Sequence, residues 1–164
     1  MSPDGNRQTI CRSIGCNTTP RCYALRGALR ALWYNEPAML DIAKQVRFWR
    51  EGAWEEMAVA RELLDRGRIR HSLFFAHLAL EKMAKAAFCK ATRIPAPKSH
   101  DLLRLVTEAG LALEPRDTEF LAQMGIYAIE GRYPGELTPA PTRAEAYVIL
   151  ERADEVNRWI ERQL

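Results

Sequence analysis

The sequence predicts an all-α fold, an up-and-down bundle of four main helices with one shorter additional helix. Apolar residues recur every three or four positions from Asp41 to the end of the chain, which is the period of a helix. No alternating strand pattern or hairpin turn interrupts this period. The connections between the long helical segments are short, and short connections place neighbouring helices antiparallel.

Start and stop signals divide this region into helices. The first helix begins near Asp41 and ends at Gly67, because glycine favours helix termination. The second helix spans about residues 69–92 and is stopped by a loop that contains two prolines. The apolar face of the first helix consists of Ile42, Val46, Trp49, Ala53, Met57, Ala60 and Leu64.

Three further helices follow. Ser99 is the expected N-cap of a short third helix that ends at Gly110. Pro115 suits the first position of the fourth helix, and Thr142 with Glu145 forms a capping box at the start of the fifth. The apolar residues assigned to these helices are Leu102, Leu103, Leu105, Val106, Phe120, Leu121, Met124, Tyr127, Ala146, Ile149 or Leu150, Ala153, Val156 and Ile160.

The first 38 residues differ from the rest in net charge and in composition. They carry five arginines against two acidic residues, whereas residues 39–164 carry 19 basic and 19 acidic residues. The balanced body lacks the global basic field that dominates nucleic-acid binding, although a small basic pocket is compatible with it. We expect residues 1–38 to be an unstructured extension, with a short amphipathic turn or two near its end, and residues 39–164 to be the folded helical domain.

The extension has two interpretations. Its arginine-rich, acid-poor composition resembles an organelle transit peptide, whereas translation from Met39 would leave it out of the native protein, and we favour the second. Cys11, Cys16 and Cys22 lack a nearby histidine and the second cysteine pair usual in zinc sites, so we expect neither a metal site nor a disulfide framework. No apolar run approaches the roughly 18 residues of a membrane span. We expect a cytoplasmic protein with no membrane contact.

The second helix carries polar residues within an apolar stripe. His77 lies in the stripe, Glu81 follows one turn later at its edge, and Lys85 follows Glu81 by another turn. These residues have three interpretations. They are a buried histidine that is hydrogen-bonded by an acid, a polar patch in a nucleotide- or RNA-binding cleft, or a metal site. The metal interpretation is the weakest because dimetal bundle centres need several carboxylates and Glu-x-x-His pairs on other helices. The opposite side of the helix is also apolar, and we expect that side to meet another subunit.

Three segments of the chain resemble motifs of the HEPN domain family. The first is HSLFFAHLALEKMAKAAF (71–88), which resembles the A-x-E-K-x-x-K-A helix of the family. The second is SHDLLRL (99–105), which resembles its His-Asp-Leu helix start, and the third is YAIEGRYPG (127–135), which resembles the Arg-Tyr-Pro end of its fourth helix. The resemblance covers about residues 41–162. It implies a helical homodimer that binds nucleotides or RNA, and a minimal nucleotidyltransferase as partner in a toxin–antitoxin pair.

The resemblance also implies a catalytic pattern, which this sequence carries only in part. RNA-cutting members work without a metal and use an arginine that is followed, after four to six residues, by a histidine. The arginine stabilises the charge that develops on the phosphate, and the histidine acts as the general acid/base. The matching arginine is Arg132, but no histidine follows it. Proton transfer would fall to Tyr127, Tyr133 or Glu130, whose free pKa values lie far from seven. Three earlier spacings of this kind are interpreted as coincidences: Arg66 to His71, Arg70 to His77 and Arg93 to His100.

We therefore expect a nucleotide- or RNA-binding HEPN-type module whose ribonuclease activity is lost or weak and which needs no cofactor. The candidate ligand-binding residues are Arg132, Tyr133, Tyr127, His77, Glu81 and Lys85, with Arg132 as the candidate catalytic residue. His100 is expected to bond locally at its helix start. The alternatives are an active metal-independent endoribonuclease toxin and a scaffold without ligand. Arg132 and Tyr133 could also serve only to end the fourth helix, with Pro134 stopping it.

Overall fold

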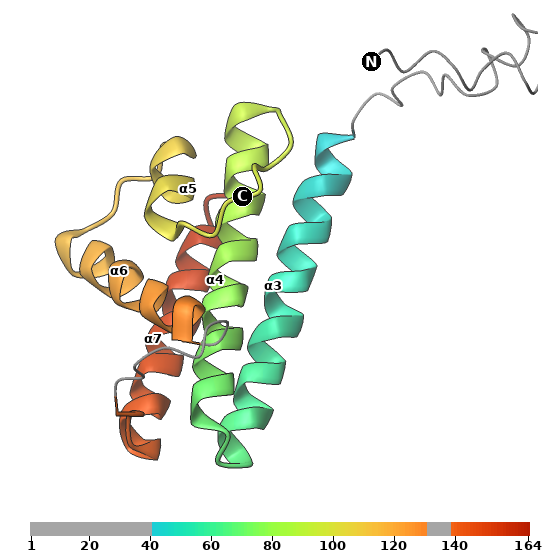
Figure 1. The fold of residues 1–164 in the computed structure, drawn as a ribbon. Coiled ribbons are helices and arrows are strands. Elements are labelled where there is room, and N and C mark those ends of the chain that lie inside the picture. The colour runs from blue at the N-terminus through green and yellow to red at the C-terminus, as the bar shows by residue number, and fades with distance from the viewer. Residues whose placement is uncertain (1–40, 131–138) are drawn as a thin grey trace, which may run out of the picture. The chain divides into compact units, whose positions relative to one another are not determined.

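The computed structural model describes residues 41–130 and 139–164. These residues form five α-helices and no strand: α3 (Ile42–Asp65), α4 (Ile69–Thr92), α5 (Leu102–Glu108), α6 (Pro115–Glu130) and α7 (Arg143–Glu161) (Figure 1). The all-α prediction is confirmed, and the arrangement is compatible with an up-and-down order. The predictions for residues 1–38, and those for Arg132, Tyr133 and Pro134, concern residues outside the described ranges.

Most helix ends lie where the capping signals placed them. Gly67 follows α3 with a φ of +71°, a left-handed conformation that costs glycine little. Pro115 is the first residue of α6, as its missing N–H allows. At α7 the Thr142 hydroxyl accepts a hydrogen bond from the backbone N–H of Glu145, and the Glu145 carboxylate accepts one from the backbone N–H of Thr142. The predicted capping box is confirmed.

The start of α5 differs from the prediction, because Asp101 rather than Ser99 is its N-cap. The Asp101 carboxylate accepts a hydrogen bond from the backbone N–H of Arg104 at 3.1 Å. The Ser99 hydroxyl accepts one from the backbone N–H of Asp101 at 3.2 Å and closes a turn ahead of the helix. Both residue types cap helices well, and the one directly before the apolar run forms the cap.

Helix α4 is central and packs against α3, α5, α6 and α7. In Figure 1 it runs beside the long helices α3 and α7, and α5 and α6 lie on one flank. Its buried side chains join those of the other helices in one hydrophobic core. The largest fully buried apolar side chains of the domain are Met57, Leu73, Leu80, Met83, Leu105, Leu121, Met124 and Ile160.

The side of α4 that we expected to meet another subunit is covered by α3 of the same chain. Lys82 lies on this side, close to Gly52 of α3, and its ammonium donates a hydrogen bond to the Glu56 carboxylate at 2.5 Å. Ala79 and Cys89 on the same side are fully buried. Part of this face is therefore buried within the chain, while Phe75 and Leu78 on it stay half-buried, and contact of this face with another subunit stays a prediction.

Candidate functional site

A buried polar network on α4 is centred on Glu81. One carboxylate oxygen of Glu81 accepts a hydrogen bond from Lys85 Nζ at 2.7 Å, and the other accepts one from His100 Nδ1 at 2.9 Å. His77 Nε2 lies 3.6 Å from the second oxygen. The Glu81 side chain is 3% exposed and that of His77 is 0% exposed. One buried carboxylate therefore faces three nitrogen-bearing side chains.

His77 connects this network to α6. Its Nδ1 lies 3.1 Å from the backbone carbonyl oxygen of Met124. Because a carbonyl oxygen only accepts, Nδ1 carries a hydrogen and donates it. Met124 lies one turn before Tyr127 on α6. The bond therefore fixes the helix that carries a predicted ligand-binding residue.

Lys85 connects the same network to α3. Its Nζ lies 5.1 Å from the centroid of the Trp49 ring, which is a cation–π distance. The Lys85 side chain is almost completely buried. Its charge is thus stabilised by the Glu81 carboxylate on one side and an aromatic face on another. Through His77, Lys85 and His100, the single carboxylate of Glu81 links four parts of the fold.

The environment of Glu81 strongly favours its ionised form. Burial alone would raise the pKa of the carboxyl group, but the nearby His77 ring, the hydrogen bonds from Lys85 and His100 and the charge of Lys85 outweigh it and lower the pKa from 4.5 to about 2. The carboxylate is therefore charged throughout the neutral range. A buried charge of this kind is tolerated only with its partners in place.

The structure brings together His77, Glu81 and Lys85 as predicted from their helical spacing, and it adds His100. His100 was expected to bond locally, and the structure shows a bond to a distant residue, because Glu81 lies 19 residues earlier, on α4. Its side chain is 58% exposed, so the otherwise enclosed network reaches the surface there. The spacing of four residues on α4 could reveal that His77, Glu81 and Lys85 lie together. His100 follows a loop, and a loop has no regular period from which its contact with Glu81 could be predicted.

Tyr127 lies elsewhere, in the wall of a hollow of about 590 Å³ between the end of α6 and the start of α7. The hollow is also lined by Gln123, by Pro139 and Pro141 ahead of α7, and by Val148. Arg132 and Tyr133, which follow α6 in the chain, are outside the described residues. Of the predicted ligand-binding residues in the described ranges, Tyr127 is the one that lines this hollow, and the Glu81 network does not.

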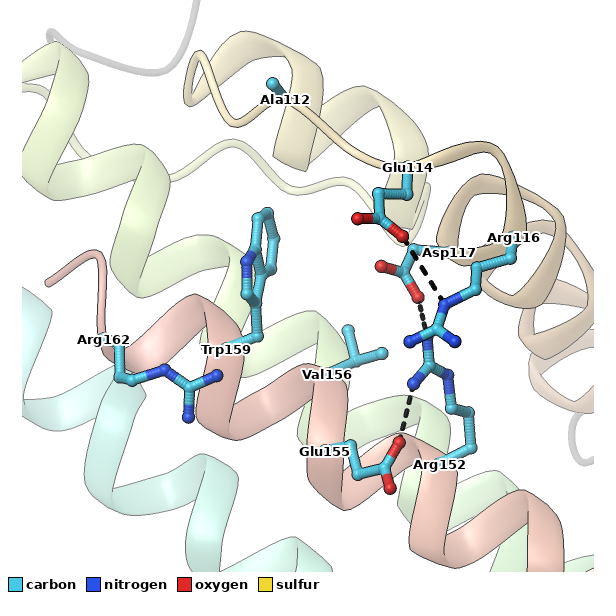
Figure 2. Close-up of a pocket in the computed structure, with 9 residues that line it drawn as sticks. All are labelled: Ala112, Glu114, Arg116, Asp117, Arg152, Glu155, Val156, Trp159 and Arg162. Carbon is cyan, nitrogen blue, oxygen red and sulfur yellow. Dashed lines mark hydrogen bonds and ion pairs between the residues drawn. The ribbon is translucent and has the colours of Figure 1, made fainter.

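A second hollow, of about 500 Å³, lies between the start of α6 and the end of α7 (Figure 2). Arg152 extends between Asp117 and Glu155, binding the first carboxylate with Nη2 and the second with Nη1, at 2.6 Å. The hydrogen bond with Glu155, together with the nearby Asp117 charge, raises the pKa of the Arg152 guanidinium. Three acidic and three basic side chains line the hollow, so its charges are balanced.

The described residues contain no group of three or more histidine, cysteine, aspartate or glutamate side chains arranged to hold a metal ion. In the same ranges, none of the helices has the length and apolar character needed to cross a membrane.

Comparison with known proteins identifies the class of protein to which this bundle belongs. The profile of the HEPN domain matches residues 46–163, and the chain therefore belongs to the HEPN domain family. TT1696 from Thermus thermophilus has a similar crystal structure, with a TM-score of 0.64 and 24% identity over 73% of this chain and 98% of that one. ST0689, an archaeal HEPN homologue, has a TM-score of 0.56 and 19% identity over 72% of this chain and 96% of that one. No curated protein matches the sequence.

Proposed function

We propose that this protein is a nucleotide- or RNA-binding HEPN module that forms a homodimer and acts with a minimal nucleotidyltransferase in a toxin–antitoxin-like pair. Arg132 holds a phosphate group, and Tyr127 and Tyr133 offer aromatic faces or hydroxyls to the rest of the ligand. Ribonuclease activity is lost or weak. Membership of the HEPN family supports the general class of this proposal.

The observation that carries the proposal is the hollow lined by Tyr127. Tyr127 is near the end of α6, five residues before Arg132 in the chain. The residues directly before α7, from Pro139 to Pro141, line another part of the hollow. The proposal gives Arg132 and Tyr127 these roles because a guanidinium pairs with phosphate oxygens and an aromatic ring stacks on a base.

The Glu81 network has a positioning role in this proposal. Tyr127 is itself only 9% exposed but lines the hollow, whereas His77, Glu81 and Lys85 are buried and do not line it. His77 instead holds the backbone of α6 one turn before Tyr127. Direct contact of His77, Glu81 or Lys85 with a ligand stays a prediction, and it would require the bundle to open.

The histidines of the chain support a lost or weak ribonuclease activity. All three precede Arg132 in the sequence, at positions 71, 77 and 100. Two of them are engaged elsewhere, since His77 bonds the carbonyl of Met124 and His100 bonds Glu81. Without an imidazole after Arg132, the general acid/base step has no group that titrates near neutrality.

A homodimer is supported by exposed apolar side chains on α6 and α7. Ile126 and Ile129 on α6 and Tyr147 and Val148 on α7 are each about half exposed or more, and Val148 also lines the hollow. Covering such side chains with a second copy would remove apolar area from water. Light scattering after size exclusion should give twice the chain mass of 18.7 kDa. A monomer at micromolar concentration would contradict this part of the proposal.

The binding claim is tested by titrating the full chain with ATP and with a short single-stranded RNA. Arg132→Ala should weaken the affinity about tenfold or more, because a charge-assisted bond to phosphate is lost. Arg162→Ala is the matched control, since Arg162 is an exposed arginine at the end of α7. Equal affinities for the wild type and Arg132→Ala would contradict the proposed site, and no binding by either would favour the scaffold alternative.

Expression in cells separates the binding module from an active nuclease. The proposal expects growth and bulk RNA to be unaffected. RNA breakdown that disappears in Arg132→Ala would establish the alternative, an active metal-independent endoribonuclease. A minimal nucleotidyltransferase encoded next to this protein, or recovered with it on purification, would support the proposed partner, and its absence from both would contradict the pairing.

A further inference from the structure

A strongly basic hollow lies at the end of the domain where α3 begins and α4 ends. Its volume is about 390 Å³, and four cationic side chains line it: Arg47 and Arg50 from α3, Lys90 from α4 and Arg93 directly after α4. Ile42 and Val46 supply an apolar wall. No acidic side chain of the described residues lines this hollow, although Leu164, the last residue of the sequence, also lines it and its terminal carboxylate adds one negative charge against the four positive ones. It differs in this respect from the balanced hollow around Arg152.

The four cations of this basic hollow differ from other basic side chains of the domain in their ion pairing. Arg61, Arg104 and Arg152 each form an ion pair at or below 2.8 Å with an aspartate or glutamate. Within the described part of the chain, no ion pair involves the four cations, and Lys90 donates to the backbone carbonyl of Gln163 at 3.2 Å. Like charges around one hollow repel each other, and a bound anion would relieve this repulsion.

Arg93 adds an independent observation, because its backbone is strained. It ends α4 with a φ of 60°, and it is the one residue other than glycine with a positive φ among the described residues. Glycine is the usual residue at such a helix end, since a side chain there is disfavoured. The strain at Arg93 is understandable if its guanidinium has a function at the hollow beside it.

We infer that the basic hollow binds a ligand that carries several closely spaced phosphate groups. Three guanidinium groups and one ammonium can each pair with phosphate oxygens, and the guanidinium fork does so with two hydrogen bonds at once. Two sources supply this chemistry, the backbone of a single-stranded RNA and the polyphosphate group of a small molecule. The site is separate from the proposed site at Tyr127 and Arg132, and it stands whether or not that proposal is correct.

The test uses the full chain with two probes, a single-stranded RNA of ten nucleotides and inorganic tripolyphosphate. The variant is Arg50→Ala with Arg93→Gly, and the control is Arg66→Ala with Arg68→Ala, which removes the same charge from exposed positions at the other end of α3 and α4. With four phosphate contacts, log K for RNA should fall with log salt concentration at a slope of about −3. The variant should reduce the slope by about 1.4 and the affinity about tenfold or more at low salt.

Each outcome decides the inference. Loss of affinity in the variant but not in the control supports the inference. If the protein binds RNA alone, the ligand is a nucleic-acid strand, and if it binds both probes, the ligand is a polyphosphate group. The inference is overturned if the wild type binds neither probe, or if the control loses as much affinity as the variant. The loss of affinity caused by Arg50→Ala with Arg93→Gly should be the same in the wild type and in an Arg132→Ala background, which separates failure here from failure of the proposed function.

The single variant Arg93→Gly guards against a folding artefact. Glycine adopts the left-handed conformation of this helix end without strain, so the melting temperature should stay the same or rise. Affinity for RNA should nevertheless fall severalfold. A variant that melts no lower than the wild type and binds as tightly would show that the Arg93 side chain does not contact the ligand.

Discussion

Two ion networks join the smaller helices to the long ones, and they differ in burial. The Glu81 network lies among α3, α4, α6 and the loop before α5, and its central carboxylate is 3% exposed. The Arg152 network joins α6 to α7 at the rim of a hollow, and its Asp117 and Arg152 side chains are 16% and 23% exposed. Both networks are therefore hydrogen-bonded ion pairs, one in a buried environment and one in a partly exposed environment.

The difference in burial sets how much each network contributes to stability. Water and salt screen the Arg152 network, and partly exposed pairs contribute roughly 1 kcal/mol or less. The partners of Glu81 cannot be replaced by water so readily, and removing one charge of a buried pair leaves the others uncompensated. Both networks contact α6, but the buried one contributes more to its position near Tyr127, because His77 bonds the backbone of Met124 one turn before Tyr127.

The largest expected effect is that of Glu81→Ala. It leaves the buried Lys85 ammonium without its carboxylate, and it should lower the free energy of unfolding by about 3 kcal/mol. Urea unfolding followed by circular dichroism measures this change. Glu119→Ala, which removes an exposed carboxylate from α6, is the control and should change little. Equal effects of the two substitutions would abolish the contrast between the networks.

The next effect is a pH dependence of stability that comes from Glu81. Its pKa is about 2 in the folded protein and near 4.5 when unperturbed, so the unfolded chain binds the proton more readily. The resulting stabilisation is complete above about pH 4.5 and is lost as the pH falls toward 2. Its size is on the order of 2 kcal/mol after allowance for solvent screening.

The pH effect is measured by comparing the wild type with Glu81→Gln in urea titrations at several pH values. The difference in unfolding free energy between the two proteins should shrink as the pH is lowered from 4.5. A constant difference across this range would mean that the carboxylate is not held in its charged form by His77, Lys85 and His100.

A smaller effect is expected for Asp117→Asn in the Arg152 network. This change weakens the contact with Arg152 and removes an acidic residue from the first turn of α6. We expect a loss of about 1 kcal/mol in unfolding free energy at low salt, and a smaller loss in roughly 0.5 M NaCl. A loss that is independent of salt would place this pair with the buried network.

The smallest effect is expected for Arg104→Ala on α5. Arg104 pairs with Glu108 one turn later, and both side chains are well exposed. Thermal unfolding should occur at the same midpoint as in the wild type. A clear shift would show that the exposed face of α5 contributes more than its contacts within the chain account for.

Much of the fold could be predicted from the sequence, because helix signals are local. The apolar period, Gly67, Pro115 and the Thr142–Glu145 box each act within a turn or two of the chain, and the structure has the helix ends at these residues. The error at Ser99 has the same local character, since two capping residues compete within three positions.

The candidate site was less accessible to such reasoning. The contacts of Glu81 with His77 and Lys85 follow from residues four apart on one helix. The bonds from His77 to Met124 and from His100 to Glu81 join different helices, and those from Arg152 to Asp117 do the same. No periodicity within one segment encodes the distance between two segments.

The sequence by itself determined that the chain from Asp41 onward is helical, where most of the five described helices begin and end, and that it resembles the HEPN family to which it belongs. Only the tertiary structure decided that α4 is covered by α3 of the same chain and that His100 completes the Glu81 network. It also decided that four cationic side chains surround one hollow. The physical reason is that hydrogen bonding and capping act between near neighbours in the chain, whereas burial and charge pairing depend on which helices pack together.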